Sequence, residues 1–381
     1  MIKTVKIDIK DQDLLGTLRA LFKNILEKED ISAILAPWRL PTKKMVMPTL
    51  LTDPDQLNGV DPLSPAFPMN SAKIVSKLTR KSSGGNIAAV MRPCEIRAFV
   101  ELVKLKQART DELIIIGVDC LGAIGNRDYL NGSGESSDEI TKDFVDHMLS
   151  GKPLDMDGIE LTQACRSCEL PLAQGADISI GLFGVDTSRQ ILAQAHTDKG
   201  SRLLENLDLA TTEEPASRRK EIDRLISEKT VFRDNMFADV ENKIGSIEKL
   251  NSYLAGCVNC YNCRVACPVC YCRECVFVTD VFDHEPNQYL QWARKKGAVK
   301  MPTDTLLYHI TRLAHMSTAC VGCGQCTNAC PNDIEVMSLF RMIAHKTQQA
   351  FDYEAGRSPE EKPPLSEFKE DEFTDVVGLN N

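Results

Sequence analysis

Eight cysteines near the C-terminus fall into two runs of identical spacing, C-x2-C-x2-C-x3-C-P. Motif one comprises Cys257, Cys260, Cys263 and Cys267, followed by Pro268. Motif two comprises Cys320, Cys323, Cys326 and Cys330, followed by Pro331. Thiolate sulfur is the soft ligand that iron–sulfur clusters need, and this spacing holds paired 4Fe–4S clusters. Two copies in one chain therefore predict the transfer of single electrons.

The spacing also predicts which cysteines share a cluster, because the fourth cysteine of each run reaches across to the other cluster. Cluster one takes Cys257, Cys260, Cys263 and Cys330. Cluster two takes Cys320, Cys323, Cys326 and Cys267. Structural zinc is a weaker alternative, since zinc sites favour two C-x2-C pairs over runs of four. Eight unligated buried thiols at these spacings is the least favoured interpretation.

Four further cysteines form what we call the N-terminal set. Its members are Cys94, Cys120, Cys165 and Cys168. Two of them follow predicted strands, and the other two form a C-x2-C pair. Open sheets bind ligands at the carboxyl ends of their strands, so four thiols meeting there would hold a third cluster. Cysteines that follow strands are more often inert core residues, and the spacing alone leaves both interpretations open.

Three more cysteines come directly after motif one. They are Cys270, Cys272 and Cys275. Three thiols cannot complete a four-ligand cluster. They are spare ligands, an alternative binding register, a site shared with a partner, or packing residues, and the sequence does not choose among these.

Alternating strands and helices are predicted ahead of the two motifs. Apolar side chains recur every three or four residues over Asp11–Glu27, which predicts a helix. Unbroken apolar runs at Ile87–Met91 and Leu113–Val118 predict buried strands, with a helix over Pro93–Gln107 between them. This order predicts an α/β fold in which helices cover a parallel or mixed sheet. Further predicted strands are Val5–Ile9, Ile31–Leu35 and Ile178–Gly184.

A long spacer, residues 268–319, separates the two motifs. Its segments Gln288–Lys296 and Thr303–Met316 are predicted to be helical. The spacer is similar to those of the all-helical ferredoxin domains in succinate dehydrogenase-type and heterodisulfide reductase-type subunits. The chain is thus divided into an α/β domain, a helical connector, an all-helical 2×(4Fe–4S) ferredoxin-type domain and an acidic tail, poorly ordered or bound to a partner. Their predicted ranges are 1–185, 186–245, 246–348 and 349–381.

Composition and missing motifs exclude several classes of function. The 381-residue chain has a net charge of −9 and no basic stripe, which argues against a nucleic-acid partner. It has neither an apolar run long enough to span a membrane nor an apolar signal core, so we expect a cytoplasmic protein. Neither a G-x-S-x-G elbow nor a G-x-G-x-x-G nucleotide fingerprint occurs. His309 and His315 fall on an amphipathic helix, where a surface or packed histidine is usual.

The motifs of the α/β domain occur in a recognisable order. Met91-Arg-Pro-Cys-Glu is followed by Ile115-Ile-Gly-Val-Asp-Cys120, by Cys165-Arg-Ser-Cys168 and by Ala176-Asp-Ile-Ser-Ile-Gly181. Over residues 30–185 this order resembles the beta subunits of coenzyme F420-reducing hydrogenase and of F420-linked formate dehydrogenase. One departure is that Asp11–Glu27 is helical where those proteins carry a glycine-rich segment. This difference weakens the expectation of a deazaflavin substrate more than the expectation of a flavin.

The resemblance implies that the N-terminal set binds a third 4Fe–4S cluster beside an FAD. It aligns Pro62–Lys73 with a flavin-contacting segment of the family. The candidate FAD contacts are Asn70, Ser71, Lys73 and Arg92. Helix capping is an equal alternative for the asparagine and the serine. Arg92 and Arg97 suit flavin phosphates, or else pair with surface acids.

We therefore expect an iron–sulfur flavoprotein oxidoreductase subunit. It would exchange hydride with a soluble carrier, coenzyme F420 or NAD(P)H, at FAD, and relay single electrons through 4Fe–4S clusters. Its partner would be a formate dehydrogenase, hydrogenase or heterodisulfide reductase subunit in a hetero-oligomer. The alternatives are a flavin-free electron-transfer subunit and, more weakly, an accessory factor that assembles clusters.

Overall fold

A seven-stranded mixed sheet forms the N-terminal part of the computed structural model, which describes residues 3–28, 30–41, 45–131, 137–151 and 159–367. Within these ranges the strand order is β1-β7-β6-β5-β4-β2-β3. Neighbouring strands from β2 through β4 and β5 to β6 pair in parallel, and the three other pairings are antiparallel. The strands are β1 (Lys3–Asp8), β2 (Ile31–Arg39), β3 (Val46–Leu51), β4 (Asn86–Met91), β5 (Leu113–Val118), β6 (Ile178–Gly181) and β7 (Gln190–Ala195).

Helices cover both faces of this sheet, and the strand alternation decides which residues face which layer. Ala88 and Val90 of β4 join one core with α1 and α5, whereas Ala89 and Met91 join the other with α2 and α3. Burial on both faces explains the unbroken apolar strands. The helices here are α1 (Leu14–Lys28), α2 (Ala72–Thr79), α3 (Pro93–Lys104), α4 (Asn126–Asn131), α5 (Ser137–Leu149), α6 (Gln163–Arg166) and α7 (Asp198–Asn206), with a 3-10 turn at Pro54–Gly59.

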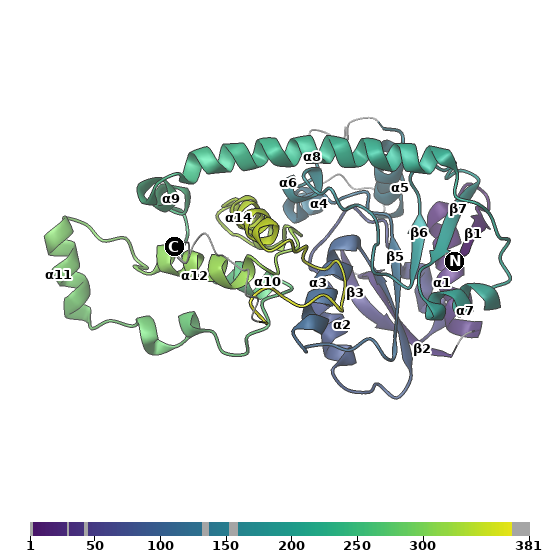
Figure 1. Ribbon diagram of the computed structural model, residues 1–381, viewed down its shortest axis with the longest axis horizontal. Coiled ribbons are helices and arrows are strands. Elements are labelled where there is room, and N and C mark those ends of the chain that lie inside the picture. Colours follow the sequence, from purple (N-terminus) through teal and green to yellow (C-terminus); the bar gives the residue numbers. More distant parts are fainter. Residues whose placement is uncertain (1–2, 29, 42–44, 132–136, 152–158, 368–381) are drawn as a thin grey trace, which may run out of the picture.

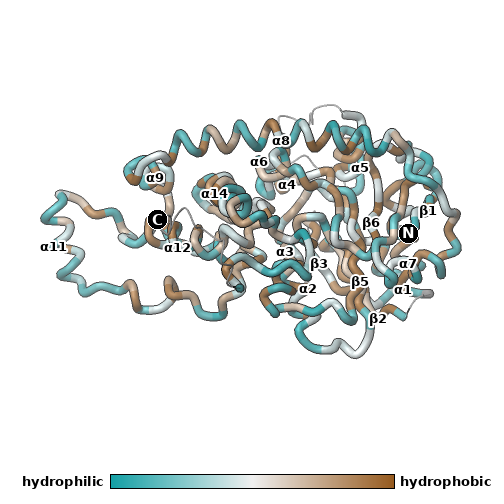
Figure 2. The backbone as a smooth tube through the Cα atoms, viewed as in Figure 1, coloured by the Kyte–Doolittle hydropathy of each residue, from teal (hydrophilic) through white to brown (hydrophobic). Residues whose placement is uncertain are grey.

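The C-terminal part is built from helices and loops (Figure 1). Its core is continuous with the α2/α3 side of the sheet, because Leu339 and Phe340 of α14 belong to the same hydrophobic cluster as Phe99 of α3. Figure 2 shows hydrophobic residues along the strands and α14. The elements are α9 (Ile247–Tyr253), α10 (Asn262–Ala266), α11 (Pro286–Lys296), α12 (Thr305–Met316), α13 (Gln325–Asn328) and α14 (Val336–Ala350), with 3-10 turns at Val276–Val278 and Asp280–Phe282.

One long helix, α8 (Ala216–Ile244), runs from the sheet to α9 along the outside of both parts (Figure 1). Near its first turn Arg218 is buried and donates to Asp119, which directly follows β5, at 2.5 Å. The Asp119 carboxylate also accepts from the backbone N–H of Leu182 at 2.9 Å. This buried ion pair ties the start of α8 to the edge of the sheet beside Cys120.

We expect Arg218→Met to destabilise the chain by about 3–5 kcal/mol, because it leaves the Asp119 carboxylate buried without its partner. Chemical denaturation of protein matched for iron content measures this. The control is Arg219→Met on the same helix, whose side chain is 86% exposed and whose loss should cost at most about 0.5 kcal/mol. Equal stabilities of the two variants would contradict the assigned role of the buried pair.

The α/β class and the helical C-terminal part are confirmed, and two local expectations differ. The connector expected over 186–245 contains β7, which pairs with both β1 and β6. The tail expected from 349 onward begins inside α14, and its Tyr353 and Ala355 are buried. Residues 368–381 lie outside the described residues. Among the helices that the structure describes, none is long and apolar enough to cross a membrane.

Candidate functional site

The carboxyl ends of β4 and β5 lie at one edge of the sheet because these strands pair in parallel. Cys94 follows β4 in the first turn of α3, and Cys120 follows β5. Pro93 begins α3, where its fixed φ suits a helix and its missing N–H has no partner to lose. The N-terminus of a helix favours the thiolate form of a cysteine, which is the form that binds iron.

All four cysteines of the N-terminal set line one small cavity, of about 30 Å³. The same cavity is lined by Cys323 of motif two, and its wall includes Phe67 and Arg92. The fold thus brings together thiols that come from α3, from the end of β5 and from the C-x2-C segment. Their role as ligands of a third cluster stays a prediction, and this convergence is the condition that it needs.

Burial opposes the ionisation of two thiols in this cavity. Burial raises the pKa of Cys94 well above that of a free thiol, and Cys323 and Cys120 add to the effect. Burial also raises the pKa of Cys120 to about 11, although Arg92 opposes it. At neutral pH such thiols lose their protons only to a metal. Four soft sulfur donors around one small cavity fit a 4Fe–4S cluster.

The C-x2-C segment is held in place by α8 and α14. Lys229 of α8 donates to the backbone oxygen of Cys165 at 3.0 Å. Arg341 of α14 donates to Ser167 Oγ at 2.6 Å and pairs with Glu169. Because α14 belongs to the C-terminal part and α8 packs against α14, this segment has a fixed position relative to motif two.

The motif cysteines have the neighbours that the crossed ligand assignment requires. Burial is the largest cause that raises the pKa of three motif-two thiols, which are Cys320, Cys323 and Cys326. A nearby Cys267 thiol raises the pKa of all three further, as the shared cluster predicts. Burial raises the pKa of Cys257, and Cys263 and Cys330 add to it. Among the described residues, no three His, Cys, Asp or Glu side chains are grouped to hold a single metal ion. The assignment of ligands to clusters stays a prediction.

Two of the candidate flavin contacts carry unsatisfied polar atoms. Asn70 Nδ2 and Ser71 Oγ are buried and have no hydrogen-bond partner among the described residues. Asn70 Oδ1 accepts from the backbone N–H of Ala72 at 3.0 Å, which is the helix-capping alternative. Ser71 N donates to Glu95 Oε1 at 2.7 Å. Buried polar groups without partners point to a missing polar group, so both residues fit a bound cofactor.

The two basic candidates contact carbonyl oxygens of the protein. Lys73 Nζ donates to Val265 O of α10 at 3.2 Å, across to the C-terminal part. The Arg92 guanidinium lies 4.7 Å from the ring centroid of Phe67. It also donates, over 2.6–3.1 Å, to the carbonyl oxygens of Ser64, Ala66 and Gly122. These contacts give both residues a structural role, and their contact with a flavin stays a prediction.

A larger cavity of about 360 Å³ opens beside the cysteine cavity, between the two parts of the chain. The two cavities share Phe67, Ala164 and Cys323 in their walls. Its polar wall includes Arg127 and Asp333, which pair at 2.9 Å. Its volume lies in the range of about 300–1,000 Å³ that is usual for sites of organic ligands. The motif spacing alone gave no signal for this cavity, because its walls come from both domains.

The three cysteines after motif one are not alike. Cys272 is exposed, and Cys270 and Cys275 are half-buried. Cys275 packs against the side chains of Phe277 and Tyr308, which favours packing as its role. For Cys270 and Cys272 the other interpretations stay open.

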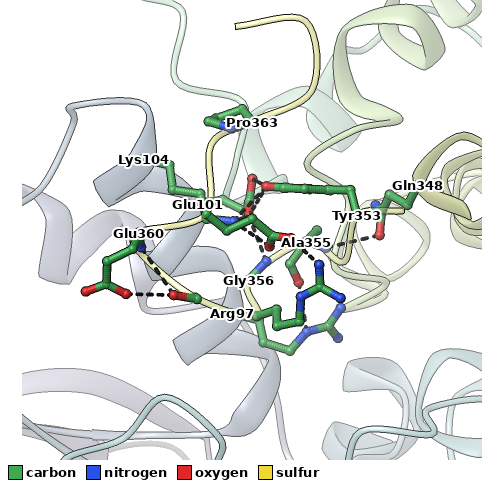
Figure 3. Close-up of polar contacts among 12 residues, drawn as sticks. Arg97, Glu101, Lys104, Gln348, Tyr353, Ala355, Gly356, Glu360 and Pro363 are labelled. Carbon is green, nitrogen blue, oxygen red and sulfur yellow. Dashed lines mark hydrogen bonds and ion pairs between the residues drawn. The ribbon is translucent and has the colours of Figure 1, made fainter. Parts of the chain in front are cut away.

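A segment that we call the C-terminal strap, residues 351–361, crosses α3 (Figure 3). Tyr353 Oη donates to Glu101 Oε1 at 2.7 Å, and the backbone N–H of Gly356 donates to the same oxygen at 2.7 Å. Lys104 Nζ lies 3.0 Å from that carboxylate. Glu101 is 1% exposed, so the strap satisfies a buried carboxylate.

Arg97 of α3 connects this strap to motif two. Its Nε donates to Ala355 O at 3.1 Å, and its Nη1 donates to Val321 O at 3.2 Å. Val321 stands between Cys320 and Cys323, and Arg97 is three residues from Cys94. These contacts give Arg97 a structural role, and its contact with a flavin phosphate stays a prediction. Its contacts hold the two cysteine sites together.

Two family models match separate parts of the chain. One describes the C terminus of the beta subunit in the family named coenzyme F420 hydrogenase/dehydrogenase, and it matches residues 84–217. The other, described as 4Fe–4S dicluster domain, matches residues 253–334. The first range contains the whole N-terminal cysteine set, and the second contains both motifs.

Similar proteins cover nearly the whole chain. The F420-dependent formate dehydrogenase subunit beta of Methanocaldococcus jannaschii is 26% identical over 93% of this chain and 97% of its own length. The F420-dependent formate dehydrogenase 1 subunit beta of Methanococcus maripaludis is 27% identical over 92% of both. A chain of the F420-reducing [NiFe] hydrogenase complex from Methanosarcina barkeri matches 65% of this chain and 94% of its own, with a TM-score of 0.46 and 14% identity.

Proposed function

Because this chain belongs to the beta subunits of coenzyme F420 hydrogenases and dehydrogenases, we propose that it is their iron–sulfur flavoprotein component. It accepts hydride from a soluble carrier, or returns it, and passes single electrons to a catalytic partner subunit. A bound FAD supplies the change from two-electron to one-electron chemistry. The residues of the chain position the cofactors and set their potentials.

The shared cysteine cavity is the observation that carries this proposal. The N-terminal set and Cys323 line the same cavity, so electrons need to cross only a short distance between the third cluster and cluster two. A scaffold without a cluster would have no need for four thiols there. The neighbouring cavity of about 360 Å³, with walls from both domains, is our candidate for the organic cofactor or the carrier.

Coenzyme F420 is the carrier that we favour. Two similar proteins are named F420-dependent formate dehydrogenase subunits, whereas no G-x-G-x-x-G fingerprint supports NAD(P)H. The same names make a formate dehydrogenase catalytic subunit the preferred partner, ahead of a hydrogenase or a heterodisulfide reductase. We also propose a cytoplasmic location, because fifteen cysteines without a disulfide among the described residues suit a reducing compartment.

The test mixes anaerobically purified, FAD-loaded protein with reduced deazaflavin coenzyme and follows the flavin absorbance. We expect rapid bleaching, together with about twelve irons per chain from three four-iron clusters. Flavin that dithionite reduces but the coenzyme does not would favour NAD(P)H or a protein donor. About eight irons and no bound flavin would favour the alternative, a flavin-free electron relay between two redox proteins.

A further inference from the structure

Helix α12, which lies in the spacer between the motifs, places three hydrogen-bonding side chains on two thiols of cluster one. Arg312 Nη1 donates to Cys263 Sγ at 3.1 Å, and Tyr308 Oη lies 3.3 Å from the same sulfur. His309 Nε2 lies 3.4 Å from Cys257 Sγ. Each thiol sulfur here stands for the iron-bound thiolate of the assembled cluster.

These three side chains are removed from water. Tyr308 is fully buried, His309 is 1% exposed and Arg312 is 4% exposed. The Arg312 guanidinium lies 4.7 Å from the ring centroid of Phe340 and donates its second Nη to Cys263 O at 3.2 Å. Within the described part of the chain no carboxylate pairs with Arg312. A buried cation without a counter-charge is costly, and a cluster with its thiolates would supply that charge.

The surroundings of cluster two are different. Across the described residues, no side chain donates a hydrogen bond to the Sγ atom of any of its four predicted ligands. The Arg312 guanidinium also lies near Cys267 and Cys326 of cluster two but donates a hydrogen bond to neither sulfur, so the difference between the clusters lies in the hydrogen bonds. Two guanidinium groups near Cys320 have other partners, since Arg341 pairs with Glu169 and Arg97 binds backbone carbonyls. The Cys320 sulfur accepts a hydrogen bond from the backbone N–H of Gly322, and the Cys323 sulfur accepts one from the backbone N–H of Gln325.

We propose that Tyr308, His309 and Arg312 are positioning residues that raise the reduction potential of cluster one above that of cluster two. Reduction adds one negative charge, which a buried cation and hydrogen bonds to the sulfurs stabilise. One electron then leaves cluster two, which is oxidised, and reduces cluster one. Cys260 of cluster one is exposed, so this cluster also delivers electrons to a partner. The inference rests on the proposed function only for the presence of both clusters.

The test is a redox titration of the anaerobically purified full chain, followed by electron paramagnetic resonance. We expect Arg312→Met to lower the reduced-to-oxidised ratio of one cluster at least tenfold at a fixed potential, about 59 mV for one electron. Tyr308→Phe and His309→Gln should shift the same component in the same direction. Arg312→Lys, which keeps the charge, should restore part of the loss. His315→Gln is the matched control, because His315 is exposed on the same helix.

Two results would overturn the proposal. One is that no component shifts in variants that keep their full iron content. The other is that the shifting component has the lowest potential of the three clusters in the unmodified chain. If the Arg312→Met protein does not assemble the cluster, the Tyr308→Phe and Arg312→Lys proteins show whether the potential of cluster one shifts. The titration does not need the flavin, so a failure of the hydride reaction is recorded separately.

Discussion

Replacement of Cys120 with serine is expected to remove one four-iron cluster and to leave the other two. The Cys120 thiol lines the cavity shared by the N-terminal set, and a hard hydroxyl oxygen is a poor substitute for a soft thiolate. Iron per chain should fall from about twelve to about eight. Reduced coenzyme should still bleach the flavin, because the candidate cofactor cavity of about 360 Å³ is lined by Cys323 and by no cysteine of the N-terminal set.

The matched control for this experiment is Cys272→Ser. Cys272 is exposed and is not among the predicted ligands, so the variant should keep its iron and its electron transfer. Iron and acid-labile sulfide analysis of both proteins, purified without oxygen, measures the difference. A Cys120→Ser protein with about twelve irons would show that the N-terminal set does not bind a cluster.

Substitution of Gly356 in the C-terminal strap is the second change with a large expected effect. Gly356 has a φ of +82°, and a Cβ there would lie 2.4 Å from Arg97 Cβ and 2.5 Å from Arg97 Cα. Gly356→Ala therefore combines left-handed backbone strain, about 1–3 kcal/mol, with overpacking of a similar size. The strap should detach from α3, and the Glu101 carboxylate should lose its hydrogen bonds from Tyr353 and Gly356.

The structure offers a close control in Gly297→Ala. Gly297 has a φ of +79°, but nothing lies within 4 Å of a Cβ built on it. The two variants share the backbone strain and differ in the collision with Arg97. We expect denaturant unfolding to separate them by about 1–3 kcal/mol, and limited proteolysis to cut residues 351–367 faster in Gly356→Ala. Equal stability and equal cleavage would show that the strap does not hold the two parts together.

The same variant tests the route of the electrons. Arg97 bonds both the strap and Val321, so a detached strap loosens the position of Cys323 relative to Cys94. Transfer between the third cluster and cluster two should become slower, while the iron content stays unchanged. That combination would separate a loss of positioning from a loss of ligands.

Local chemistry made the cysteine motifs and the class of fold predictable. The predicted ligands within one motif are close together in the chain, so their spacing alone predicts how their sulfurs are arranged around a cluster. The unbroken apolar runs of β4 and β5 likewise carry their double-sided burial in the sequence. By contrast, the Ile191–Ala193 stretch of β7 is short and lies in a charged region, and only its pairing with β1 and β6 makes it a strand.

Contacts between distant segments were decided by the tertiary structure alone. His309 and Arg312 lie on the buried face of the amphipathic helix α12, where the sequence does not distinguish a functional residue from a packing residue. Only the tertiary structure shows that they contact the predicted cluster-one thiols. Tyr353 lies in a segment of acidic composition, yet a buried carboxylate of α3 holds it. Spacing along the chain predicts which sulfur atoms bind a cluster. Which cluster stands beside which cavity depends on how separate elements pack, and no local pattern carries that information.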